Sequence, residues 1–393
     1  KKKSPPVWQN WRRFFVGKWE MVRLDDVCKA VSSNIAQKDL ENSNGVYPIY
    51  GASGFIKNVD FYKHDQKYIA IVKDGAGVGR ATLNPAKSSV LGTMQAIVPK
   101  PNITAEYLFY AIRRMNLSKY NTGATIPHIY FKDYKKESLP LPPLEVQQQI
   151  ANTLDRAATL IEKRKEQIEK LDLLVKSQFI EMFGDPVTNP KGWGQVKFNT
   201  ILSSKASNGF FARRNEYTDT GNVGILGVAN IVNRRYSNLG NLPRTNAKEN
   251  EIRKYLIKYG DLLFCRSSLV AEGIGKASII PEGVFEDILF ECHVIRTPLD
   301  LTICVPEYIQ ELTTSSYFRK QILKKSKTST MTTISQDAIL NTDILLPPLE
   351  LQREFYLFVQ QVESQKSLLQ KSLYKLEVNN KSLTQKCFSG ELL

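Results

Sequence analysis

The chain has 393 residues, of which 42% are hydrophobic, so it is long and apolar enough to bury the cores of two or more domains. Its 54 Lys and Arg residues exceed its 39 Asp and Glu residues, and the formal net charge of +15 makes a polyanion such as nucleic acid the first partner to consider. The 5 cysteines are scattered without a C-x-x-C pair, which argues against a zinc ribbon or a disulfide framework and favours a reducing compartment.

Residues 1–17 are predicted to form a basic leader that is poorly ordered. Aromatic residues lie beside Arg12 and Arg13 in this stretch, so an arm that contacts nucleic acid is the alternative. No apolar run of about 7–15 residues follows the basic start, and nowhere do about 18 apolar residues run together. We therefore expect neither secretion nor a membrane span, and a cytoplasmic location.

Residues 18–141 are predicted to form a first globular domain, because short β-type runs alternate there with Gly and Asn turns. A basic glycine loop, Lys73 to Arg80, follows the apolar run 68–72, and its glycines would let the backbone approach a phosphate. The loop lacks the G-x-G-x-x-G spacing of a nucleotide site, so an ordinary hairpin turn is the alternative. Further candidate DNA contacts precede the next element: Thr122, Thr125, His128 and Tyr130. For His128, a structural role is the alternative.

Residues 142–184 are predicted to form one long helix, opened by Pro142-Pro143 and ended by Gly184. About 40 residues span about 60 Å at 1.5 Å per residue, too long for one compact domain, so the helix needs a partner. Its apolar residues step by threes, fours and sevens, as a heptad stripe requires. These stripe positions are Ile150, Leu154, Ala157, Ile161, Ile168, Leu171, Val175 and Met182.

Residues 185–346 are predicted to form a second domain that resembles the first, since Gly273-Ile-Gly-Lys-Ala277 parallels Gly77-Val-Gly-Arg-Ala81. Two arginine pairs in turn-rich stretches are candidate readers of guanine, with phosphate contact as the alternative: Arg213, Arg214, Arg234 and Arg235. Candidate clamps on the DNA backbone are Arg266, Lys276, Lys327, Thr328 and Thr330.

Residues 347–390 are predicted to form a second long helix that repeats the first. Pro347-Pro-Leu-Glu350 copies Pro142-Pro-Leu-Glu145 at an offset of 205, and Gln352 falls at the place of Gln147. The repeated stripe contains Phe355, Val359, Val362, Leu369, Leu373, Leu376 and Leu383. We expect an α+β chain in which two globular domains are separated by two long antiparallel coiled-coil helices, as a pseudo-two-fold repeat. The alternative makes each helix a core element of its own domain.

Motifs for chemistry are missing from the sequence. There is no G-x-x-x-x-G-K-[ST] loop for ATP, no Asn/Asp-Pro-Pro-aromatic signature of amino-methyltransferases and no Glu-x-Lys pair. His64, His128 and His293 form no triad or metal cluster that the sequence can identify. We therefore expect a protein without catalytic residues and without a metal site.

From about Trp19 to its end, the chain resembles the specificity subunit of Type I restriction-modification systems. The resemblance is carried by the run Leu139–Gln147, its repeat at 346–352, and the segment Tyr259–Phe264. It implies two target-recognition domains, each reading half of a split site on double-stranded DNA in a prokaryotic cell. It also implies that the helices set the gap between the half-sites and dock two methyltransferase subunits, which restriction and translocase subunits join. This chain would bind no cofactor, whereas its partners would use S-adenosylmethionine, ATP and Mg²⁺.

Symmetry supports the same function. Two domains related by a pseudo-two-fold axis present reading surfaces in opposite orientations, as half-sites on a duplex do. Because the domains differ widely outside the shared motifs, the full site should be asymmetric. The alternative is a non-enzymatic coiled-coil scaffold without sequence-specific DNA binding, which would not need basic reading surfaces on both domains.

Overall fold

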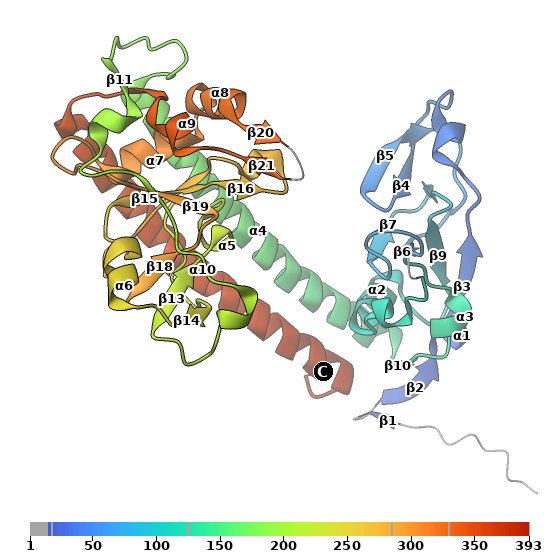
Figure 1. Ribbon diagram of the computed structural model, residues 1–393. Helices are drawn as coiled ribbons and strands as arrows, with labels where there is room; N and C mark the ends of the chain where they lie inside the picture. The colour runs from blue at the N-terminus through green and yellow to red at the C-terminus, as the bar shows by residue number, and fades with distance from the viewer. Residues whose placement is uncertain (1–14, 17–18, 124–125, 284–285, 329–330, 393) are drawn as a thin grey trace, which may run out of the picture. The chain divides into compact units, whose positions relative to one another are not determined.

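The computed structural model describes residues 15–16, 19–123, 126–283, 286–328 and 331–392 (Figure 1). The chain divides into two compact units, Lys1–Lys165 with Lys371–Leu393, and Glu166–Gln370. Each unit holds one globular domain and a part of each long helix. Except for Phe15 and Val16, the expected leader lies outside the described residues. None of the described helices is long and apolar enough to cross a membrane.

The first domain is built on a four-stranded antiparallel sheet in the order β3-β9-β6-β7, with bounds Cys28–Ser32, Met94–Pro99, Tyr68–Val72 and Ala81–Asn84. A second sheet has the order β5-β4-β8, with bounds Gly54–Val59, Tyr47–Gly51 and Ser89–Val90, and β4 is parallel to β8. The sheet β1-β2-β10 joins Phe15–Val16, Trp19–Arg23 and Ser138–Pro140. The helices are α1 (Leu24–Val27), α2 (Ala105–Arg114) and α3 (Phe131–Tyr134), with 3₁₀ turns at Gln37–Leu40 and Leu117–Tyr120.

The second domain repeats these sheets. Its four-stranded antiparallel sheet is β12-β19-β15-β17, with bounds Ser207–Asn208, Val294–Pro298, Asp261–Cys265 and Ala277–Ile279. The sheet β14-β13-β18 joins Arg244–Thr245, Val223–Leu226 and Ile288–Phe290, and β13 is parallel to β18, as β4 is to β8. Strand β11 (Gln195–Lys197) pairs with β22 (Asp343–Leu345), as β2 does with β10.

Other elements of the second domain surround these sheets. A small sheet, β16-β21-β20, joins Ser267–Ser268, Thr332–Thr333 and Lys327–Thr328. The helices are α5 (Val228–Ile231), α6 (Glu249–Tyr255), α7 (Pro306–Thr314), α8 (Ser316–Lys325) and α9 (Gln336–Leu340). Short 3₁₀ turns lie at Phe198–Ile201, Arg214–Glu216 and Ala271–Gly273.

The repeat extends to single hydrogen bonds. The Tyr107 hydroxyl donates to the Pro140 carbonyl at 2.7 Å, and the Tyr308 hydroxyl donates to the Leu345 carbonyl at 2.9 Å. The tyrosines lie on α2 and α7, and each carbonyl lies on the strand that leads to a long helix. The same bond therefore fixes the same crossing in both domains, which confirms the internal repeat.

The long helices are α4 (Leu144–Phe183) and α10 (Leu349–Ser389). They end where Gly184 and Gly390 adopt left-handed φ angles of 78° and 76°, which favour glycine. Every predicted stripe residue is buried or half-buried. In the first unit Lys165 pairs with Glu377 at 3.2 Å, and in the second unit Asp172 pairs with Lys366. The helices are therefore antiparallel partners.

The ends of both helices also belong to the domain cores. Ile150 and Leu154 of α4 join Cys387 and Phe388 of α10 in the first core, where Phe388 stacks on Tyr107 at 5.1 Å between ring centroids. In the second core, the aromatic rings of Phe179, Phe183, Tyr308 and Phe355 lie 4.6–5.6 Å apart. The alternative core role therefore applies to the ends of both helices.

Candidate nucleic-acid interface

The glycine loop of the first domain connects the antiparallel strands β6 and β7, so it is the hairpin that the sequence left open as an alternative. Gly75, Gly77 and Gly79 have φ angles of 84–88°, and a Cβ on Gly79 would lie 2.6 Å from the Ser118 nitrogen. Only glycine therefore fits this turn without strain.

This loop lies against the segment that carries the other first-domain candidates. The Gly75 N–H donates to the Pro127 carbonyl at 2.8 Å, and the Ile129 N–H donates to the Lys73 carbonyl at 2.9 Å. Two segments that are distant in the sequence, 73–80 and 126–130, thus lie side by side.

The side chains of this surface differ in exposure. Arg80 and Thr122 are exposed, whereas Lys73 is half-buried. The guanidinium of Arg80 donates to the Ala52 carbonyl, and Thr122 Oγ1 donates to the His128 carbonyl at 3.3 Å. The His128 and Tyr130 rings lie 5.2 Å apart at 64°, and Tyr130 is exposed. Thr125 lies outside the described residues.

Sequence analysis missed Lys132 on this surface. Its Nζ lies 5.1 Å from the centroid of the Tyr130 ring, at the distance of a cation–π contact. The lysine stands in a short stretch with Lys135 and Lys136. This run of three lysines is the signal in the sequence that points to Lys132.

In the second domain the equivalent surface is built by Arg266 and the small sheet β16-β21-β20. The Ile334 N–H donates to the Arg266 carbonyl at 3.0 Å, as Ile129 does to Lys73. The Arg266 guanidinium donates to the Cys292 carbonyl at 3.0 Å, so this half-buried side chain anchors the loop. Lys327 and Thr328 are exposed on β20, and Thr330 lies outside the described residues.

Exposed apolar side chains accompany both surfaces. Leu269 is 81% exposed in the loop after β16, and Ile126 is 64% exposed in the segment 126–130 of the first domain. Apolar contact with the thymine methyl group is one way that proteins read DNA bases, so these side chains add to the candidates. Sequence analysis missed them because a single apolar residue in a loop carries no periodic signal.

The four arginines of the two pairs in the second domain differ in exposure. Arg213 and Arg214 are exposed, as a base or phosphate contact requires, and so is Arg234. Lys276 is half-buried, and its Nζ donates to Asn233 Oδ1 at 2.5 Å. Arg234 and Lys276 therefore belong to one local cluster.

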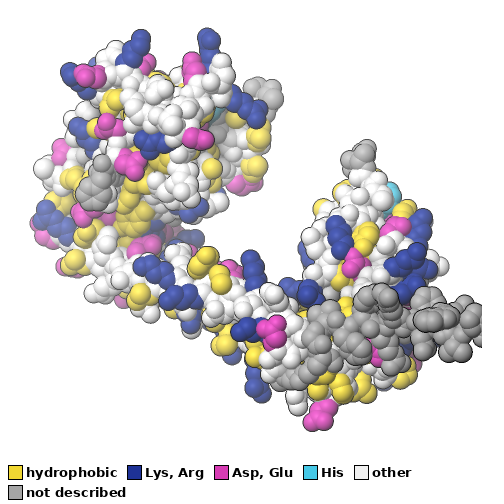
Figure 2. Space-filling view, turned by 90° about the horizontal axis from the view of Figure 1, so that it is seen from below, with side chains coloured by type: hydrophobic (Ala, Val, Ile, Leu, Met, Phe, Trp, Pro, Cys, Tyr) yellow, Lys and Arg dark blue, Asp and Glu magenta, His cyan; other side chains and the backbone are white. Residues whose placement is uncertain are grey.

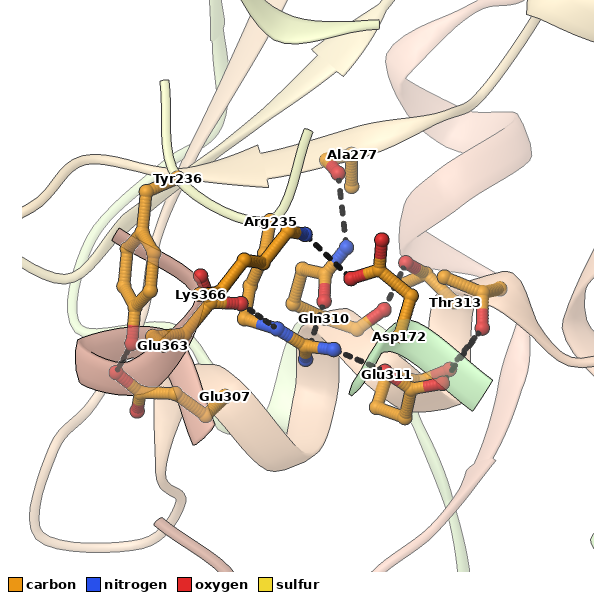
Figure 3. Close-up of polar contacts among 11 residues, drawn as sticks. Asp172, Arg235, Tyr236, Ala277, Glu307, Gln310, Glu311, Thr313, Glu363 and Lys366 are labelled. Carbon is orange, nitrogen blue, oxygen red and sulfur yellow. Dashed lines mark hydrogen bonds and ion pairs between the residues drawn. The ribbon is translucent and has the colours of Figure 1, made fainter. Parts of the chain in front are cut away.

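Arg235 is a correction to the sequence analysis, because its side chain is only 11% exposed and is bound inside the domain. Its Nη2 lies 2.8 Å from Glu311 Oε2, its Nε lies 3.2 Å from Glu363 Oε1, and its Nη1 donates to Gln310 Oε1 at 3.0 Å (Figure 3). Burial alone would lower the pKa of Arg235, but the charges of Glu311 and Glu363 raise it. This guanidinium is an internal charge, and its Nε, Nη1 and Nη2 atoms all donate to side chains of the same domain and of α10.

The neighbouring Tyr236 extends the same network to α10. Its hydroxyl donates to Glu307 Oε1 at 2.9 Å and accepts from the Gln360 amide at 2.9 Å. Gln360 and Glu363 lie on α10, so Arg235 and Tyr236 tie their loop to the long helix. The half-buried ring of Tyr236 packs against the second core.

The charge on the surface is mixed. Figure 2 shows Lys and Arg side chains on the visible face of both globular domains, and acidic side chains are interspersed among them on both. Because the net charge is strongly positive but acidic side chains are mixed among the basic ones, contacts to nucleic acid are expected at local clusters of basic side chains.

The cysteines behave as core residues. Burial raises the pKa of the Cys28 thiol to about 12 and that of the Cys265 thiol to about 11, so both stay protonated at neutral pH. Among the residues that the structure describes, no group of three or more His, Cys, Asp or Glu side chains could hold a metal ion.

The fold defines the class of protein: two copies of one α+β domain, each with an exposed loop surface carrying basic side chains, attached to a pair of long helices. Residues 17–170 match the family model of the Type I restriction modification DNA specificity domain. Over 408 aligned residues, the chain is 24% identical to the Type I restriction enzyme MjaVIII specificity subunit of Methanocaldococcus jannaschii, with coverage of 95% of this chain and 93% of the relative.

Solved structures share the fold. The S subunit of a Type I restriction-modification system from M. genitalium superposes with a TM-score of 0.55 at 14% identity, over 94% of this chain and 96% of that chain. A chain from a structure of complex assembly and conformational transition of the type I R-M system gives 0.51 at 17% identity, with 95% and 98% covered. The chain is therefore similar over most of its length to specificity subunits of Type I restriction-modification systems, and residues 17–170 match the DNA specificity domain of that family.

Proposed function

We propose that the chain reads an asymmetric DNA site in two separate halves, one with each domain. The repeat is the observation that carries this proposal, because equivalent loops stand on equivalent hydrogen bonds while their side chains differ. Lys73 and Arg80 lie next to β6 in the first domain. In the second domain Arg266 takes the place of Lys73 and Lys276 takes the place of Arg80, both next to β15. Two similar frames with different loop side chains suit two different half-sites.

The same proposal gives the long helices two tasks, setting the unread gap and docking two methyltransferase subunits. Restriction and translocase subunits would complete the assembly, and S-adenosylmethionine, ATP and Mg²⁺ would be bound by these partners. The relative from M. jannaschii is named as a subunit of a restriction enzyme, which supports a multi-subunit assembly. Exposed apolar residues on the helices are suited to docking: Leu160, Leu173, Leu357, Leu368 and Tyr374 are 55–70% exposed.

A domain exchange tests the split site. Residues 185–346 would be replaced by the second domain of another family member, and the methylated sites of the host would be mapped by methylome sequencing. We expect one half of the methylated sequence to change and the other half to stay the same. A change in both halves, or in neither, would contradict the assignment of one half-site to each domain.

Binding measurements test sequence specificity itself. The chain with its methyltransferase partners should protect its own split site, and its affinity should fall steeply as salt rises, because phosphate contacts release counterions. A scrambled duplex of the same length is the control. Equal affinity for both duplexes would reject specific recognition in favour of a scaffold.

A further inference from the structure

A cavity lined in part by basic side chains lies at the same place in each copy of the repeat. In the first domain it has a volume of about 650 Å³ and lies between the start of β7 and helix α2. In the second domain it has a volume of about 620 Å³ and lies between the start of β17, helix α7 and the long helices. Ala81 and Ala277 line the two cavities at matching positions of the repeated glycine motif.

The acidic residues of the second cavity are all bound to basic partners. Glu311 and Glu363 are paired with Arg235, and Asp172 is paired with Lys366 (Figure 3). Four further basic residues line this cavity and have no acidic partner among the described residues: Lys176, Arg234, Lys276 and Arg319. The cavity therefore has an excess of positive charge.

Arg319 makes this excess costly for the free protein. Its half-buried guanidinium donates to the backbone carbonyls of Ile274 and Glu272, the latter at 3.0 Å, and no carboxylate balances it. Burial lowers the pKa of Arg319, as expected for a cation that has lost water without gaining a counter-charge. A bound anion would supply that charge.

The first cavity is more apolar and is lined by fewer charged side chains. Arg80 and Arg113 line it together with Asn116 and Ser118, and none of its lining residues is acidic. The Arg113 guanidinium lies 5.3 Å from the centroid of the Phe109 ring, which leaves its N–H donors available at the cavity.

We infer that each cavity binds a phosphate group of the DNA backbone, through Arg80 and Arg113 in the first domain and through Arg234 and Lys276 in the second. This inference rests on the proposed function and deepens it. Both cavities adjoin a recognition loop, since Arg80 ends the loop 73–80 and Lys276 ends the loop 266–276. Phosphate contacts fix the orientation of a protein on the duplex without carrying sequence information. Each clamp would thus orient the loop next to it.

The test measures how affinity depends on salt. Two double variants, Arg80→Gln with Arg113→Gln and Arg234→Gln with Lys276→Gln, would be assembled with the methyltransferase partners on the cognate duplex. Each lost phosphate contact should reduce the slope of log K against log salt by about 0.9. We expect a reduction of about 1 per double variant, because each cavity holds one phosphate group, with the preference for the cognate sequence unchanged. Lys38→Gln and Lys248→Gln, on exposed lysines outside the cavities, are the matched controls.

Charge-retaining variants separate a lost contact from a damaged fold. Arg80→Lys with Arg113→Lys, and Arg234→Lys with Lys276→Arg, should keep the wild-type slope. If the wild type discriminates its site but the glutamine variants keep the full slope, the cavities do not bind the backbone and the inference is overturned. If the wild type does not discriminate at all, the proposed function itself fails.

A second measurement distinguishes the DNA backbone from a free anion. Inorganic phosphate would be added to the complete chain without DNA, and its Tm would be followed in the wild type and in both glutamine variants. A phosphate-dependent rise in Tm that the variants lose, together with their reduced salt slope, supports the clamp. The same rise combined with unchanged slopes would identify a small-anion site and overturn the assignment to DNA.

Discussion

The side-chain oxygen of Gln147 accepts a hydrogen bond from the Thr104 backbone N–H at 2.8 Å, which ties the first turn of α4 to the residue that caps α2. Gln352 accepts the same bond from the Val305 N–H at 2.9 Å. The amide groups of Gln147 and Gln352 donate in turn to the carbonyls of Pro142 and Pro347, each at 2.8 Å. One buried glutamine thus locks each long helix to its domain.

Replacing Gln147 by alanine should destabilise the first unit by about 2–3 kcal/mol, because the Thr104 N–H and the Pro142 carbonyl would lose their partner in a buried place. The measurement is unfolding by denaturant, followed by circular dichroism. Gln148→Ala is the control, since that side chain is exposed and bonds only to Asn152 among the contacts of the described residues. Equal losses for the two variants would show that the buried bonds contribute nothing specific.

Arg235→Ala should destabilise the second unit by about 3–5 kcal/mol, because it leaves Glu311 buried without its counter-charge. The double variant Arg235→Ala with Glu311→Ala should be less destabilised than the sum of the two single variants, since each single change already breaks the pair. Denaturant unfolding measures all three. Arg234→Ala, on the exposed neighbour, should change stability by less than about 0.5 kcal/mol. A mild effect of Arg235→Ala would mean that the ion pairs are not formed in solution.

The sequence could predict the features that local chemistry encodes. Proline pairs and glycines mark the ends of the long helices, so the helices predicted over 142–184 and 347–390 span Leu144–Phe183 and Leu349–Ser389. The offset of 205 revealed the repeat, and the heptad steps found the buried face of each helix.

Contacts between distant residues could not be predicted in this way. Arg235 stands in a turn-rich stretch, where an arginine is normally at the surface, but its partners Glu311 and Glu363 follow 76 and 128 positions later. The contact between the segments 73–80 and 126–130 is equally non-local. Only tertiary structure separates the internal Arg235 from the exposed Arg234.

Asp261 predicts a pH dependence of stability. Burial raises the pKa of its carboxyl from 3.8 to about 6, although the Lys258 N–H donates to it at 2.8 Å and Arg296 lies 4.0 Å away. The folded state therefore binds this proton more tightly than the unfolded state. The stabilising contribution is fully present below about pH 4 and is lost as the pH rises through about 6.

Asp261→Asn should remove this dependence while keeping an acceptor for the Lys258 N–H. Relative to the wild type, the variant should gain about 1 kcal/mol of unfolding free energy between pH 5 and pH 8. Unfolding by urea at both pH values measures this difference. Asp300→Asn is the control, because hydrogen bonds from Thr302 lower the pKa of the Asp300 carboxyl instead of raising it. The same gain in both variants, or no gain in Asp261→Asn, would contradict the raised pKa.

The antiparallel helices predict how the gap between half-sites responds to insertions. One heptad of seven residues adds about 10 Å to a helix, which corresponds to about three base pairs at 3.4 Å each. Inserted after Lys165 alone, it shifts the stripe of α4 against α10 and should abolish assembly or specific methylation. Inserted after both Lys165 and Gln370, it keeps the two helices in register and should widen the unread gap while leaving both half-sites unchanged. Methylome sequencing reads the outcome directly.

Four residues inserted at the same two points form the matched control, because they break the heptad phase in both helices. A gap that stays the same after the double heptad insertion would refute the role of the helices as the spacer.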